Sequence, residues 1–226
     1  ASSPWFWPGV GVGTALVLWS CSYVLPDGTL RLVPGRRAGI ATLLWVCAFF
    51  LTLDYLVAPS AHDVLGLTPT QTGWALTAGG IGWSAVAIAC GARPAREPQA
   101  YRRRTMLATV FFVVGTMLMV VTVLEKADWW GLPVGYGVAS IGMGLTHLDT
   151  MNRIVTDPAE PDGITHAQAA TAVTIAGAAG GAVLGTATTA FVAPAAAGVE
   201  PGRLWPTLFL LAVGLLLTPL LARRAA

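Results

Sequence analysis

The sequence has few charged side chains: Asp, Glu, Lys and Arg make up 11% of its 226 residues, whereas hydrophobic residues make up 55%. A soluble globular domain carries roughly a quarter charged residues, so this class of protein is excluded. The net charge of +2 is too small to indicate a nucleic-acid partner, and the basic residues are grouped beside apolar runs. We therefore predict an all-α integral membrane protein that is surrounded by the lipid bilayer and binds no nucleic acid.

Lysine, cysteine and histidine are scarce as well. Lys126 is the only lysine and lies between two apolar runs, which excludes a retinal Schiff base on a membrane-spanning lysine. The cysteines lie within apolar runs without metal-type spacing and are expected to be buried thiols: Cys21, Cys47 and Cys90. The histidines are far apart, so neither a metal site nor a cofactor is expected: His62, His147 and His166. His147 and Asp149 point about 200° apart on a helix, so no enzyme active site is predicted.

Seven apolar runs are long enough to be membrane-spanning helices, since a helix needs about 20 residues to cross ~30 Å of hydrocarbon. They are Trp5–Leu25, Ala38–Ala58, Gln71–Ala92, Thr105–Glu125, Leu132–Ile154, His166–Val192 and Leu204–Ala222. Before the third run, Thr68, Pro69 and Gln71 match a capping box with proline in the first turn, which predicts a helix start. The fourth run is apolar on all sides and is expected to be a lipid-facing support.

The segment RPAREPQAYRRR determines the predicted orientation. One arginine at the centre of a membrane helix costs ~2.5 to 3.5 kcal/mol, so we predict that this segment is a loop, and arginine-rich loops stay in the cytoplasm. Its basic residues are Arg93, Arg96, Arg102, Arg103 and Arg104. Seven spans then place all 13 basic residues except Lys126 and Arg203 on the cytoplasmic side. With seven spans, this distribution predicts an N-terminus outside and a C-terminus in the cytoplasm. A composition rich in arginine and glycine is typical of a GC-rich bacterial genome, so we predict a multi-pass protein of the cell (inner) membrane.

Two carboxylates interrupt the apolar runs. Asp54 lies in the second run, where an ionisable group indicates function by default; the alternative is an outer-interface carboxylate that reaches water or Tyr55. Asp149 lies near the end of the fifth run, four residues before Arg153. At this spacing the two side chains share one helix face, which predicts a salt bridge at the cytoplasmic end. A polar group that faces a substrate or proton path is the alternative.

Glycine and tryptophan mark two further positions. Gly177, Gly181 and Gly185 are spaced four residues apart in the sixth run, which predicts the close approach of another helix. A glycine-lined face beside a moving cavity is compatible with this packing. Trp83, which glycines flank in the third run, is expected either to pack in the core or to wall a cavity.

Three blocks of sequence resemble one transporter family. Residues 63–95, DVLGLTPTQTGWALTAGGIGWSAVAIACGARPA, are similar to the start of the second half of major facilitator superfamily exporters of the fourteen-span drug/proton antiporter branch. The residues that fit that pattern are Val64, Leu65, Gly66, Thr68, Pro69, Gln71, Gly73, Gly79 and Gly80. Residues 142–163 and 176–187 resemble later segments of the same half. The resemblance extends over Ala38–Ala222 and implies two parts: a linker transmembrane helix with a basic cytoplasmic loop (1–37) and a six-helix carboxy-terminal half (38–226).

This resemblance implies a mechanism of alternating access, in which two six-helix halves rock around a midplane site. The expected function is proton-coupled efflux of a small organic or lipophilic molecule. The expected partners are this substrate and the missing amino-terminal half, on the same or a separate chain. Contacts to substrate or protons are expected at Asp54, Trp83, Thr146 and Asp149. The basic segment lacks the aspartate that the family carries there, which leaves open a second hypothesis, a membrane scaffold or subunit without transport.

Overall fold

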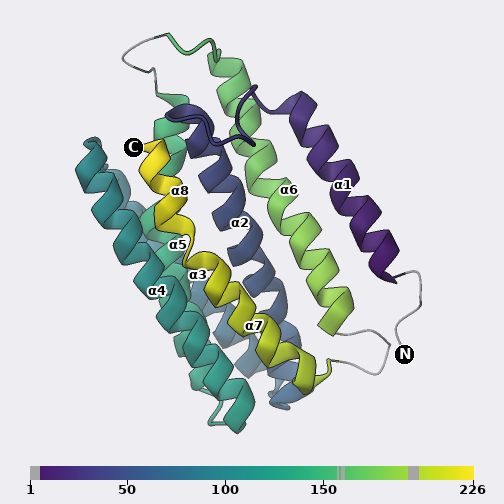
Figure 1. Cartoon of the computed structure of the whole chain (residues 1–226). Helices are drawn as coiled ribbons and strands as arrows, with labels where there is room; N and C mark the ends of the chain where they lie inside the picture. Colours follow the sequence, from purple (N-terminus) through teal and green to yellow (C-terminus); the bar gives the residue numbers. More distant parts are fainter. Residues whose placement is uncertain (1–5, 157, 159–160, 193–198) are drawn as a thin grey trace.

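The computed structural model describes residues 6–156, 158, 161–192 and 199–226. It is all-helical, with 82% of residues in helices and no strand in the described part, as predicted. The elements are α1 (Phe6–Val24), α2 (Arg36–Pro59), a π-helical turn η1 (Ser60–Val64), α3 (Pro69–Ala92), α4 (Pro98–Glu125), α5 (Gly131–Val155), α6 (His166–Val192), α7 (Pro201–Leu215) and α8 (Thr218–Ala225). The helices lie side by side as a bundle; from α1 to α7 successive α-helices run in opposite directions, and α8 continues from α7 (Figure 1).

The predicted start of α3 is confirmed. The Gln71 N–H donates to Thr68 Oγ1 (3.3 Å), and the Thr68 N–H donates to Gln71 Oε1 (2.9 Å), so both hydrogen bonds of the capping box are present. Pro69 occupies the first turn, where its missing N–H leaves no helical hydrogen bond unmade. The last apolar run differs from the prediction because it is divided between α7 and α8, with Pro219 in the first turn of α8.

Five helical segments are long and apolar enough to cross a membrane, and this agrees with a membrane-embedded protein. They are Arg36–Val64, Pro69–Ala92, Pro98–Glu125, His166–Val192 and Pro201–Ala225. The apolar part of α1 within the described residues, Pro8–Val24, is shorter. Helix α5 is long enough, but His147, Asp149 and several glycines and threonines reduce its apolar character. The count of seven spans remains a prediction.

The basic segment is only partly a loop. Helix α4 begins at Pro98, seven residues before the predicted start, so Arg102, Arg103 and Arg104 lie in its first two turns. Only Arg93 and Arg96 lie in the connection between α3 and α4. Proline in the first turn and an extended Glu97 before it favour a helix start here. The prediction failed because the energetic argument excludes arginine from hydrocarbon, whereas a helix can extend beyond the hydrocarbon.

Helices α2 and α5 form the centre of the bundle. Helix α5 packs most extensively against α3 and α4, and α2 packs against α6, α5 and α8. The core between them contains the fully buried side chains Phe50, Leu53, Phe112, Met119 and Met143. Helix α1 lies at the outside beside α6 (Figure 1) and exposes most of its large side chains.

Glycine allows α4 and α5 to approach closely. A Cβ atom on Gly115 of α4 would lie 2.2 Å from the Ala139 nitrogen of α5, and one on Gly142 of α5 would lie 2.7 Å from the Ala108 carbonyl oxygen of α4. One face of α4 is therefore buried against α5, including Phe112 and Met119, while Val110, Val114 and others on the opposite face remain exposed. A lipid-facing support remains the expectation for the exposed face of α4, whereas the buried face was not predicted, because periodicity cannot identify a buried face when both faces are apolar.

Candidate functional site

The arginines gather at the end of the bundle where the chain terminates. The Gly35 N–H donates to the Arg224 carbonyl oxygen (2.9 Å), and Arg102 Nη2 donates to the Arg223 carbonyl oxygen (3.3 Å). These contacts join the start of α2, the start of α4 and the end of α8, which lie together at one end in Figure 1. We call this the arginine end. Lys126 and Arg203 belong to elements at the opposite end.

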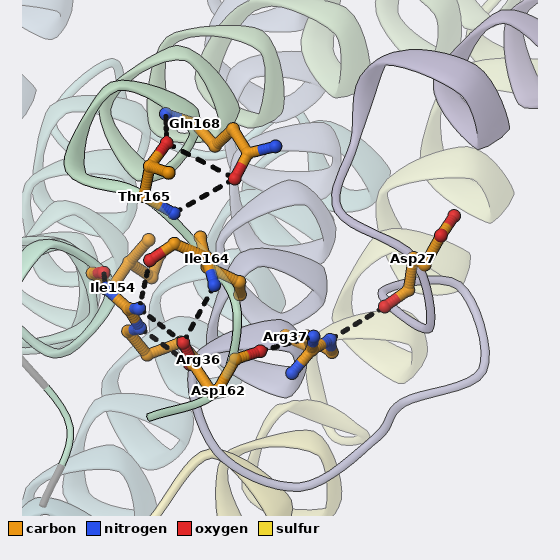
Figure 2. Close-up of polar contacts among 8 residues, drawn as sticks. All are labelled: Asp27, Arg36, Arg37, Ile154, Asp162, Ile164, Thr165 and Gln168. Atoms are coloured by element: carbon orange, nitrogen blue, oxygen red, sulfur yellow. Dashed lines mark hydrogen bonds and ion pairs between the residues drawn. The ribbon is translucent and has the colours of Figure 1, made fainter. Parts of the chain in front are cut away.

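At the arginine end, Arg36 holds the segment between α5 and α6 against the start of α2 (Figure 2). Its Nε donates to Asp162 Oδ2 (2.8 Å), and its Nη2 donates both to Asp162 Oδ1 (2.5 Å) and to the Ile164 carbonyl oxygen (2.6 Å). Its side chain is 6% exposed and that of Asp162 is 19% exposed. Hydrogen bonding from Arg36 lowers the pKa of Asp162 to about 2, and the Ile164 N–H and the charge of Arg37 act in the same direction. Asp162 is therefore ionised across the physiological pH range.

Asp149 belongs to a second ion pair at this end, and its partner differs from the predicted one. Asp149 Oδ2 accepts from Arg104 Nη1 (2.6 Å), and Oδ1 accepts from the Ala95 N–H (3.1 Å). Arg153 instead lies over the Tyr101 ring, 4.5 Å from its centroid, and donates to the Arg96 carbonyl oxygen (3.2 Å). The predicted Asp149–Arg153 salt bridge was wrong because the first turns of α4 bring Arg104 to the carboxylate and the connection from α3 to α4 brings the Ala95 N–H to it.

A second group of polar side chains lies in the interior of the bundle. The Tyr136 hydroxyl of α5 donates a hydrogen bond to Asp54 Oδ1 of α2. Tyr136 is buried (4% exposed) and Asp54 is half-buried. The predicted alternative partner, Tyr55, is exposed and packs against Gly185 of α6. The carboxylate in α2 is therefore held by a phenol from another helix.

Aromatic rings continue from this hydrogen bond along the interface of α2, α3 and α5. The Tyr136 ring stacks on Phe50 with 6.0 Å between centroids, Phe50 meets Trp83 edge to face at 5.7 Å, and Trp83 meets His147 at 5.4 Å. We call Asp54, Tyr136, Phe50, Trp83 and His147 the interior row. It places ionisable groups at both of its ends, with three aromatic rings between them.

The structure brings some predicted site residues together and separates others. Asp54 and Trp83 belong to the interior row, whereas Asp149 lies at the arginine end. Thr146 is buried (1% exposed), and its hydroxyl has no hydrogen-bond partner among the described residues. Sequence reasoning placed Phe50 on the same helix face as Asp54, but it missed Tyr136 and did not connect His147 to this row. The available signal was a tyrosine in the fifth apolar run, but nothing in the sequence pairs that run with the second one, which contains Asp54.

The glycines of α6 contribute unequally to packing. A Cβ atom on Gly181 would lie 2.7 Å from Leu51 of α2, and one on Gly185 would lie 2.2 Å from the Tyr55 ring. Gly177 has no atom within 4 Å of such a position, whereas Gly180 is 2.7 Å from the Leu44 carbonyl oxygen. The closest backbone approach of α2 and α6 therefore occurs at Gly180.

Neither a protein-family model nor a curated protein matches this sequence.

Proposed function

We propose that this chain is the carboxy-terminal half of a proton-coupled membrane exporter, which moves a small organic or lipophilic molecule by alternating access. The observation that carries the proposal is the interior row. A carboxylate in an apolar helix is costly and is retained where it binds ions, protons or substrate. Asp54 is half-buried and has a hydroxyl partner from a different helix, so a relative movement of α2 and α5 would change its hydrogen bonding.

The remainder of the row suits an apolar or aromatic substrate. Trp83 and His147 are half-buried at the interface of α3 and α5, and aromatic faces bind lipophilic and cationic molecules through stacking and cation–π attraction. Asp54 would supply the group that takes up and releases a proton. The amino-terminal half, on the same or a separate chain, would complete the substrate site.

In this proposal the helices form seven spans in the bacterial cell membrane, with α1 as the linker and six spans from α2 to α8. The arginine end faces the cytoplasm, which follows from the rule that short arginine-rich segments stay inside. Arg103→Cys and Lys126→Cys test the orientation, because both residues are exposed and lie at opposite ends. With a membrane-impermeant thiol reagent, Lys126→Cys should react in intact cells, and Arg103→Cys should react only after the membrane is opened. Reaction of both in intact cells would contradict the orientation.

The transport proposal is tested with inverted membrane vesicles that contain the complete protein, with ethidium as the probe and an imposed proton gradient. Asp54→Asn should reduce gradient-driven ethidium movement by about tenfold or more, since an amide cannot carry the proton. Tyr136→Phe keeps the ring on Phe50 but removes the hydroxyl, and should alter the pH dependence of transport. Asp128→Asn is the matched control, because this exposed carboxylate lies in the connection between α4 and α5.

A membrane scaffold or subunit without transport is the second candidate. It is favoured by the contacts of Asp149. The resemblance implied that this residue contacts substrate, but its carboxylate accepts hydrogen bonds from Arg104 and from the Ala95 N–H. Unchanged transport in both Asp54→Asn and Asp149→Asn, with normal assembly in the membrane, would support the scaffold and refute the exporter.

A further inference from the structure

A pocket of about 820 Å³ opens at the arginine end. Its walls come from the start of α2 (Gly35, Arg36), the connection between α3 and α4 (Pro94 to Arg96), the last turn of α5 (Asn152, Arg153) and the end of α8. The interior row does not line it, so the pocket is separate from the proposed transport site. Its size is in the range that small-molecule ligands occupy.

Among the described residues that line this pocket, positive charges outnumber negative ones. Three of its lining residues are arginines: Arg36, Arg96 and Arg153. Asp149 is the acidic residue of the lining, and Arg104 neutralises it at 2.6 Å. Arg36 is paired with Asp162. The excess positive charge therefore comes from Arg96 and Arg153.

Arg153 has unused hydrogen-bonding capacity. Its Nη2 donates to the Arg96 carbonyl oxygen and its guanidinium lies over the Tyr101 ring, but no carboxylate among the described residues forms an ion pair with it. Its Nε–H is buried and lacks a hydrogen-bond acceptor in the described part of the chain. A guanidinium has five N–H donors in a planar arrangement that matches the oxygen atoms of a phosphate. A buried donor without an acceptor is unfavourable, so a ligand that supplies oxygen atoms here is favoured.

We propose that this pocket binds a phosphate group, held chiefly by Arg153 and Arg96. The pocket lies between the start of α2, the connection from α3 to α4 and the ends of α5 and α8, the level at which apolar helices give way to polar segments. In a bilayer this is the level of lipid phosphates, and basic pockets between membrane helices bind acidic lipid headgroups. The phosphate of an anionic phospholipid and free phosphate offer the same oxygen atoms, and experiment separates the two sources.

Three variants of the full chain test the site. Arg153→Gln removes the main guanidinium, and Arg96→Gln removes one whose side chain is exposed. Arg103→Gln is the matched control: it removes the same charge from the same end, but Arg103 is exposed and does not line the pocket. Each protein is purified in detergent, mixed with phosphatidylglycerol or phosphatidylcholine, and the bound lipid is measured by native mass spectrometry. Inorganic phosphate is then added as a competitor at constant ionic strength.

We expect wild-type protein and Arg103→Gln to bind more phosphatidylglycerol than phosphatidylcholine. The affinity for phosphatidylglycerol should fall about tenfold or more in Arg153→Gln and in Arg96→Gln, as expected for the loss of a charge-assisted hydrogen bond. Another outcome is that inorganic phosphate binds, that neither lipid is preferred, and that the affinity for phosphate falls in Arg153→Gln and Arg96→Gln. This outcome would support the site and show that its ligand is soluble. Equal behaviour of Arg96→Gln and Arg103→Gln would overturn the proposal even if Arg153→Gln fails to fold, because it would show diffuse attraction by charge.

Discussion

The contact between Arg36 and Asp162 should stabilise the bundle, and Asp162→Asn removes its charge. The substitution keeps the shape of the side chain and an oxygen that can still accept from the Ile164 N–H. It eliminates the carboxylate that binds Arg36 through both Nε and Nη2. Since these bonds attach the segment before α6 to the start of α2, their loss should weaken the packing of both helices at the arginine end.

The magnitude follows from the pKa of Asp162, which Arg36 lowers from 3.8 to about 2. A lowered pKa means that folding favours the ionised carboxylate, and this difference corresponds to about 2 kcal/mol at neutral pH, with some reduction because the side chain is 19% exposed. We therefore expect Asp162→Asn to destabilise the protein by about 1 to 2 kcal/mol.

The same pKa gives the dependence on pH. Stabilisation by a carboxylate whose pKa is lowered on folding is complete above its unfolded value and is lost as pH falls through its folded value. The contribution of Asp162 should therefore be present above about pH 4 and disappear toward pH 2. Asparagine does not titrate, so the difference in stability between wild-type protein and Asp162→Asn should shrink over this range.

Unfolding by sodium dodecyl sulfate in mild-detergent micelles, followed by circular dichroism, measures this difference. Asp27→Asn is the matched control, because Asp27 is exposed and contacts Arg37 through its backbone carbonyl oxygen only. The control should lie close to wild type at every pH. Equal destabilisation by Asp162→Asn and Asp27→Asn, or a difference from wild type that does not change between neutral pH and pH 2, would refute the reasoning.

Two further predictions use the same unfolding measurement. Gly180→Ala should destabilise the contact of α6 with α2 by about 1 to 3 kcal/mol, since the added methyl group would meet backbone, whereas Gly177→Ala, with open space around it, should have little effect. Arg104→Gln should be more destabilising than Asp149→Asn, about 3 against about 1 kcal/mol, because it leaves a carboxylate that is 2% exposed without its cation, whereas Arg104 can reach water. The reverse order would contradict this reasoning.

The apolar runs and turn chemistry of the sequence predicted most of the helices. Within the described residues each of the seven runs forms helix over most of its length, and the Thr68 cap locates the start of α3. Helix boundaries were predicted less well where charged residues were taken as evidence against a helix. The start of α4 is an example, because this helix begins at Pro98, within the basic segment. Apolarity of a run indicates that a helix can enter a membrane, but it contains no information on where the helix ends beyond it.

The sequence did not predict which side chains contact each other between different helices. The i,i+4 spacing of Asp149 and Arg153 correctly places both on one helix face, but Arg104, from a different helix, provides the carboxylate's partner. In the same way Asp54 was recognised as unusual, while Tyr136 was not, since a tyrosine in an apolar run is unremarkable until a carboxylate faces it. Such pairs depend on the rotation of each helix, which an almost uniformly apolar run leaves undetermined.

The distribution of interactions along the bundle sets the interior row apart. Ion pairs with arginine lie toward the two ends of the bundle: those of Arg36 and Arg104 at the arginine end and that of Arg203 with Glu200 at the opposite end. Within the apolar length, the helices approach through glycines such as Gly115, Gly142 and Gly180, which bring backbones together without polar groups. Stability alone would be served by extending this glycine packing through the level of Asp54. A carboxylate there is costly, and among the described residues it accepts one side-chain hydrogen bond, from Tyr136; the proposed function accounts for this cost by a proton or substrate that Asp54 would bind.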